Sequence, residues 1–188
     1  MNLGILYGLN LEEVNCSNNK ITNIVMDSVG ELVKFDCSNN DLMTLDVSQC
    51  LKLEELNCSG NQLMELDVGH QTQLTQLDCS NNKLTELNVK QNGSLTSLIC
   101  NDNQLTTLDL SHNHSLSKLN CAKNRLACLD VTGISGGTIT ANGNRRPIAV
   151  RTDGKFDLTT LSGFNVGKAT NWNGGSVSGT ILTVEDGK

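Results

Sequence analysis

The amino-acid sequence repeats itself every 21 residues, and this period limits what the chain can fold into. Segments align without gaps from six leucines: Leu11, Leu32, Leu53, Leu74, Leu95 and Leu116. The fourth segment reads LTQLDCSNNKLTELNVKQNGS. A fixed period of this length is the signature of stacked repeat units, each of which buries its apolar side only against its neighbours. The sequence therefore predicts an elongated array whose stability is collective.

The first half of each repeat, L-x-x-L-x-C, alternates in the way that a strand with one buried face does. Its last apolar column consists of cysteines: Cys16, Cys37, Cys58, Cys79, Cys100 and Cys121. Three residues further on, each repeat carries an asparagine: Asn19, Asn40, Asn61, Asn82, Asn103 and Asn124. A buried asparagine at a turn can hydrogen-bond backbone groups of its own and adjacent repeats. We therefore expect an in-register parallel sheet followed by an asparagine ladder.

The second half of each repeat, L-x-x-L-D-V, is too short for a helix with its turns. We expect extended or 3₁₀-like segments there, on the convex side. The predicted fold class is mainly β: a right-handed solenoid with parallel strands in one concave sheet and a small β cap at its C-terminal end. Aromatic residues make up only 3% of the chain, so the core has to be built from Leu, Val, Ile and Cys.

The pattern L-x-x-L-x-C-x-x-N-x-L resembles the leucine-rich-repeat family, and the nested 21-residue form looks like its short bacterial type. The resemblance covers residues 1–132, because Leu3 and Ile5 fit the last two columns of a preceding turn. It implies a secreted or surface-anchored bacterial protein with a role in adhesion or host interaction, and hence an extracellular or cell-surface location. Unpaired cysteines would also suit a reducing cytosol, so the compartment stays open.

The period fails after Val131, and residues 133–188 are rich in Gly, Thr and Ser. Short runs at residues 138–141, 148–151 and 180–184 predict strands separated by turns. The last turn of an array exposes an apolar end and a strand edge, which a terminal segment commonly covers. Phe156, Phe164 and Trp172 could cover that end. We expect this segment to be a cap docked on the array rather than a free domain, and the start of a following module is the alternative.

Six of the eight cysteines occupy one apolar column and lack the spacing of zinc ligands, so we interpret them as core residues. Cys50 and Cys128 lie outside that column and are expected to be the exposed thiols. The stretch from Gly133 to Gly137 matches G-x-S-x-G, but no helical pattern follows it as a nucleophile elbow requires. The sequence predicts no enzyme activity, cofactor or metal site.

A second polar column could be mistaken for a cation site. It consists of Asp46, Asp67, Asn88, Asp109 and Asp130. Stacked carboxylates could hold Ca²⁺, which takes oxygen ligands. Each side chain could instead cap its own turn by accepting a backbone N–H. We favour capping, because the glycine-rich nonapeptide of calcium-binding β-rolls is absent.

The outward positions of the concave strands are the candidate binding residues. They are Glu13, Asn15, Lys34, Asp36, Glu55, Asn57, Gln76, Asp78, Ser97, Ile99, Lys118 and Asn120. The surface is polar, and Ile99 is its only apolar member. Because protein hot spots favour Trp, Tyr and Arg, this composition suits a weak or avidity-driven contact. The same residues could merely keep the sheet soluble.

These features favour a macromolecular binding or adhesion module, with a protein ligand first and a carbohydrate second. A structural spacer without a ligand of its own is the alternative. The net charge of −6 argues against nucleic acid as a partner. No apolar run is long enough for a transmembrane helix. We expect a monomer.

Overall fold

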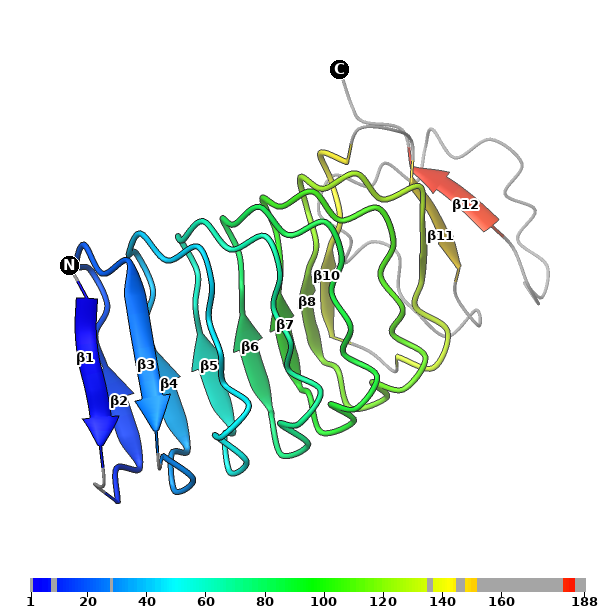
Figure 1. Ribbon diagram of the computed structural model, residues 1–188. Coiled ribbons are helices and arrows are strands. Elements are labelled where there is room, and N and C mark those ends of the chain that lie inside the picture. The colour runs from blue at the N-terminus through cyan, green and yellow to red at the C-terminus, as the bar shows by residue number, and fades with distance from the viewer. Residues whose placement is uncertain are drawn as a thin grey trace.

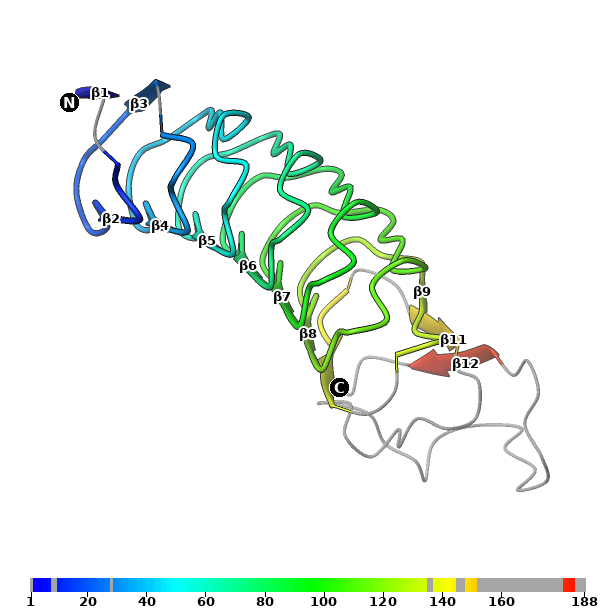
Figure 2. The same cartoon turned by 90° about the horizontal axis from the view of Figure 1, so that it is seen from below.

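The computed structural model describes residues 2–7, 10–27, 29–134, 137–144, 148–151 and 181–184. The chain winds into a curved array of stacked turns (Figure 1). One parallel sheet of seven strands runs along its inner side (Figure 2). In spatial order these strands are β2 (Glu13–Asn15), β4 (Lys34–Asp36), β5 (Glu55–Asn57), β6 (Gln76–Asp78), β7 (Ser97–Ile99), β8 (Lys118–Asn120) and β10 (Thr138–Thr140).

Residues that share a column in the sequence repeat pair with one another across neighbouring strands of this sheet. Phe35 pairs with Val14 on one side and with Leu56 on the other, and each further strand continues the column. From β2 to β8 the shift between neighbouring strands is one repeat, so equivalent residues lie side by side; β10 pairs with β8 at a shift one residue shorter. The predicted fold class, a leucine-rich-repeat solenoid with parallel strands in one concave sheet, is confirmed.

The convex side is extended rather than helical. β1 (Asn2–Tyr7) pairs in parallel with β3 (Asn23–Asp27), and Asp67 forms an isolated bridge with Asn88. No helix, whether α or 3₁₀, occurs in the described ranges. Of the two conformations expected here, the extended one is therefore the one the chain adopts.

The core between the two sides is aliphatic, with Phe35 as its largest side chain. Cys37, Cys58, Cys79, Cys100 and Cys121 have no exposed surface and continue the leucine columns, which confirms their interpretation as core residues. An unpaired thiol behaves as a small apolar group, so it can serve as a core residue in this column.

The asparagine column forms the expected ladder. The side-chain amide of Asn40 donates to the carbonyls of Cys37 (3.0 Å) in its own turn and Cys16 (3.0 Å) in the preceding turn. Its Oδ1 accepts the N–H of Ile21 (3.0 Å), also in the preceding turn. Asn61, Asn82, Asn103 and Asn124 repeat this arrangement. Each asparagine therefore links two turns where the sheet no longer does.

A second buried ladder lies in the turn that follows the convex segment, and sequence reasoning missed it. Its column is Val29, Cys50, Gln71, Asn92, Asn113 and Ile134, all of them at most 3% exposed. Asn92 donates to the carbonyls of Val68 and Gln71, both at 2.9 Å. Among the described residues, the side-chain oxygens of Gln71, Asn92 and Asn113 have no hydrogen-bond partner. Amides serve here as internal caps for carbonyls.

Cys50 belongs to this column, so the expectation that it is an exposed thiol was wrong. Its side chain has no exposed surface, and its Sγ lies 3.6 Å from Sδ of Met26. The turn closes through a hydrogen bond from the N–H of Cys50 to the carbonyl of Val47 (2.8 Å), and this turn directs the side chain inward. Cys128 is exposed, as expected.

The array continues beyond the last complete repeat. Ile139 on β10 pairs with Leu119, and Asn144 accepts the N–H of Leu126 at 3.0 Å, as an asparagine of the ladder does. β9 (Cys128–Asp130) pairs with β11 (Ile148–Arg151), which pairs antiparallel with β12 (Ile181–Val184). The three strands predicted after residue 132 are therefore confirmed, to within one residue. The division of the chain at that residue stays a prediction, and Phe156, Phe164 and Trp172 lie outside the described residues.

Candidate binding face

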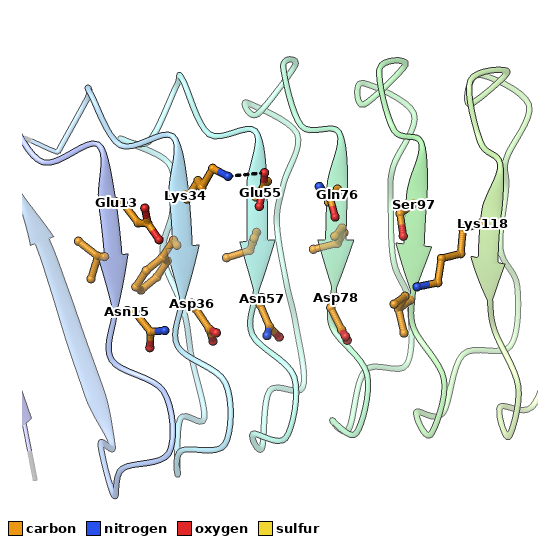
Figure 3. Close-up of a pocket in the computed structure, with 15 residues that line it drawn as sticks. Glu13, Asn15, Lys34, Asp36, Glu55, Asn57, Gln76, Asp78, Ser97 and Lys118 are labelled. Atoms are coloured by element: carbon orange, nitrogen blue, oxygen red, sulfur yellow. Dashed lines mark ion pairs between the residues drawn. The ribbon is translucent and has the colours of Figure 1, made fainter.

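A groove runs across the concave sheet from β2 to β8. Its lining includes all the predicted binding residues except Asn120: Glu13, Asn15, Lys34, Asp36, Glu55, Asn57, Gln76, Asp78, Ser97, Ile99 and Lys118. Figure 3 labels all of these residues except Ile99, and they lie in two rows that cross the strands. The fold therefore brings these residues together on one face, whereas their role as ligand contacts stays a prediction.

The first row of the groove begins with Glu13, Lys34 and Glu55. The Lys34 ammonium forms an ion pair with Glu55 at 2.8 Å (Figure 3). The hydrogen bond and charge of Glu55, together with the charges of Glu13 and Glu54, raise the pKa of Lys34. Both partners of the pair are at least a third exposed, so the pair contributes little to stability. The groove is thus acidic around a cation that is already paired.

The second row is Asn15, Asp36, Asn57, Asp78, Ile99 and Asn120. Asp36 accepts the N–H of Ser38 at 2.9 Å, and Asp78 accepts the N–H of Ser80 at 3.0 Å. Asn15, Asn57 and Asn120 do the same for the residue two positions on. Such Asx turns satisfy the backbone where the strand ends. The spacing Asx-x-Ser, which recurs in the four repeats from Asn15 to Ser80, is the sequence signal for this role.

Ile99 interrupts this row, and its side chain is half-buried between Asp78 and Asn120 on the neighbouring strands. It cannot form the Asx turn that the rest of the row forms. Nothing in the packing of β7 explains an apolar side chain at this outward position. Ile99 is therefore a residue whose identity the fold does not require.

The convex Asp column caps its own turns, as favoured from the sequence. Asp46 accepts the N–H of Ser48 at 2.9 Å, and Asp67 accepts the N–H of Gly69 at 2.8 Å. Asn88, Asp109 and Asp130 form the same contact. The hydrogen bonds from Ser48 lower the pKa of Asp46. No group of three metal-ligating side chains occurs in the part of the chain that the structure describes.

The buried thiols do not form a reactive centre. Loss of solvation raises the pKa of Cys50 to about 11 and that of Cys121 to about 12, and it raises the pKa of Cys58 and Cys100 well above the usual value of a thiol. Thiolate is the nucleophilic form, so these groups are inert near neutral pH. Ser135 of the G-x-S-x-G match lies outside the described residues, and Gly137 leads directly into strand β10.

Two comparisons with known proteins agree with this fold. The family model "Leucine Rich Repeat" matches residues 10–32. Among solved structures, the chain is similar to the functional domain of InlJ from Listeria monocytogenes, described as including a cysteine ladder. The identity is 38%, the alignment covers 81% of this chain and 38% of that one, and the TM-score is 0.59. A comparison with curated proteins gave no match.

Two further solved structures share the fold. The LRIM1/APL1C complex is 27% identical over 80% of this chain and 30% of that one, with a TM-score of 0.71. A leucine-rich-repeat protein of Leptospira interrogans is 21% identical over 73% of this chain and 38% of that one, with a TM-score of 0.62. The chain thus spans 30–38% of the length of these three proteins.

The described residues contain no helix with the length and apolarity that crossing a lipid bilayer requires. The gapless repeats, the parallel solenoid with its cysteine and asparagine columns, and the matches to the family model and to solved structures all lead to one assignment. The chain is a leucine-rich-repeat protein, and its 21-residue repeats are similar to those of bacterial members of that family.

Proposed function

We propose that the chain is a protein-binding module of a bacterial secreted or surface-anchored protein, and that its partner occupies the concave groove. The observation that carries this proposal is the groove itself, which crosses the strands from β2 to β8. Stacked repeats of this kind commonly use their concave surface for binding. The proposed role is binding rather than catalysis, by a monomer, at an extracellular or cell-surface location.

Ile99 supports this proposal, because it places an apolar side chain in a groove whose other outward residues are polar. A partly exposed aliphatic side chain contributes little to folding stability, but burying it against a partner contributes favourable free energy to binding. Protein is therefore the first ligand class. Carbohydrate is the second, since the outward positions of the groove carry no aromatic side chain on which a sugar ring could stack, and Phe35 in its floor is buried. The alternative of a structural spacer is favoured by the Asx turns, which give most of the second row a role within the fold.

The test compares two variants, and each introduces a residue that other repeats carry at the equivalent position. Ile99→Asn restores the Asx-type residue of the other turns, so the fold should be preserved. Met64→Thr removes an exposed apolar side chain from the convex side and serves as the matched control, because Thr85 and Thr106 follow it in that column. Purified wild-type chain and both variants would be assayed against candidate host surface proteins and a glycan array.

We expect saturable binding by the wild-type chain. Ile99→Asn should weaken it about tenfold, which corresponds to about 1.4 kcal/mol of binding free energy. Met64→Thr should leave it unchanged. Binding that is equally strong in all three proteins would show that the groove is not the site. Absence of binding to every protein and glycan would favour the spacer.

A further inference from the structure

We propose that the β4–β6 half of the concave groove binds a basic, extended segment of the protein partner, with two Arg or Lys side chains reaching Asp36 and Asp78. This inference rests on the proposed function and specifies the chemistry of the partner. It is carried by the charge of the face, by a comparison of equivalent turns and by the spacing between the two carboxylates.

The charge of the face is uneven along the array. Over β4, β5 and β6 the outward acidic residues are Asp36, Glu55 and Asp78, and the outward cation is Lys34. Glu55 already neutralises that cation at 2.8 Å. The other cation, Lys118, belongs to β8 at the far end of the groove (Figure 3). A partner with complementary charge is therefore basic where it lies over this half.

The fold does not require these two negative charges. Asn15 and Asn57 occupy the same column and form the same turn with an amide oxygen. In Asp36 and Asp78 one oxygen serves the turn, while the second accepts no hydrogen bond from any residue that the structure describes. The turn fixes the orientation of each carboxylate, so its free oxygen is held in place for a ligand at little entropic cost.

The spacing of the two carboxylates suits one backbone conformation of the partner. Asp36 and Asp78 lie two strands apart, with Asn57 between them, so they are separated by about 10 Å. A polyproline II segment has three residues per turn and rises about 9.3 Å over them. Basic side chains at positions i and i+3 of such a segment therefore point the same way with a matching separation. A β-strand would direct positions i and i+3 to opposite sides.

The chain provides its own reporters for this contact. The backbone amides of Ser38 and Ser80 donate to Asp36 and Asp78 and should shift in an NMR spectrum when the carboxylates bind a cation. The amides of Ser48 and Gly69 make the same contact with Asp46 and Asp67 on the convex side. Those two amides are matched controls for unspecific attraction to carboxylates.

The experiment titrates the ¹⁵N-labelled chain with the peptide Pro-Pro-Arg-Pro-Pro-Arg-Pro-Pro at low salt. Two control peptides have glutamine in place of both arginines, or both arginines adjacent. We expect the first peptide to shift the amides of Ser38 and Ser80 and to leave those of Ser48 and Gly69 in place. The neutral peptide should not bind, and the adjacent-arginine peptide should bind about tenfold more weakly.

The variant pair is Asp36→Asn with Asp78→Asn, compared with Asp46→Asn with Asp67→Asn. Both pairs keep the turns and lose the same charge, as the natural asparagines of the two columns show. We expect the concave pair to weaken peptide binding about tenfold and the convex pair to leave it unchanged. Equal binding by both pairs, by both arginine peptides, or at both sets of amides would overturn the inference.

Failure of this inference can be distinguished from failure of the proposed function. A host protein whose binding depends on Ile99 but ignores Asp36→Asn with Asp78→Asn would overturn the basic-segment inference and leave the groove as the site. Absence of any protein or glycan partner in the panel would count against the proposed function itself.

Discussion

At the scale of single residues, each turn of the array brings one residue into the left-handed backbone region. Positive φ angles recur at Asn18, Asn39, Gly60, Asn81, Asp102, Lys123 and Gly143. Asn, Asp and Gly tolerate this region, whereas other residues pass into it only at a cost of about 1–2 kcal/mol. The turn beside the asparagine ladder thus favours Asn, Asp or Gly through its backbone conformation, and Lys123 is the exception among these positions.

Gly137 is the position where this requirement is strictest. Its φ is +94°, and a Cβ would lie 2.0 Å from the carbonyl oxygen of Ser117. We expect Gly137→Ala to destabilise the chain by about 3 kcal/mol and to detach β10 from β8. Urea unfolding and hydrogen exchange of the β10 amides would measure the two effects. Gly93→Ala is the control, since its Cβ would meet nothing closer than 3.5 Å; equal losses in both variants would contradict the steric argument.

The wrong prediction that Cys50 is an exposed thiol has its cause at the residue scale. Cys50, Gln71 and Asn92 share a column, and polar residues at a loop position normally indicate exposure. In this array the loop carbonyls turn inward, because the turn closes on Val47 and its equivalents, so an amide is the residue that satisfies them. The identity of the side chains was visible in the sequence, but the direction of the backbone carbonyls was not.

At the scale of elements, the strands of the concave sheet have only three residues each, so that sheet alone makes few hydrogen bonds per turn. The asparagine ladder adds a second set of links between turns, and the buried Gln71–Asn92–Asn113 ladder adds a third. Parallel strands, column register and the first ladder could be predicted from the sequence, because periodicity fixes which residues become neighbours. The sequence also predicts which residues share the concave face. It does not reveal how far these residues serve the Asx turns rather than a ligand, because that depends on backbone geometry.

A single ladder residue should therefore matter more inside the array than at its edge. Asn82 donates to the carbonyls of Cys58, Cys79 and Ser80 and accepts the N–H of Leu63. We expect Asn82→Ala to reduce the free energy of unfolding by about 3 kcal/mol, because it leaves buried backbone groups without partners.

Asn19→Ala is the control for that prediction. Asn19 is exposed and donates only to the carbonyls of Cys16 and Ser17 in its own turn. Its loss should be below about 1 kcal/mol, since water can replace the missing hydrogen bonds. Urea titrations of both variants, followed by circular dichroism, would test this difference; a loss at residue 19 as large as that at residue 82 would contradict the role of the ladder between turns.

At the scale of the whole molecule, each turn contacts only its neighbours, so the array opens from its ends inward. The cysteine column can report how easily each turn opens, because it places one thiol in each turn from Cys16 to Cys121. Burial keeps these thiols protonated, so a thiol reagent modifies each one only after its turn opens.

We expect Cys128 to react first, Cys16 next and Cys79 last when the native chain is treated with a thiol reagent at neutral pH. Cys128 is exposed, Cys16 is half-buried, and Cys79 is fully buried in the middle of the array. Peptide mapping by mass spectrometry after increasing labelling times would give the order. Simultaneous modification of Cys16 and Cys79 would indicate all-or-none opening instead.

The Asx turns of the second row have a consequence for how such a face can change. Asparagine and aspartate form the same turn here, and their codons differ by a single base. A point mutation can therefore switch the charge at one rung of the groove while the backbone of that rung stays as it was. Variation can thus explore new partners along this row one step at a time, without passing through misfolded intermediates.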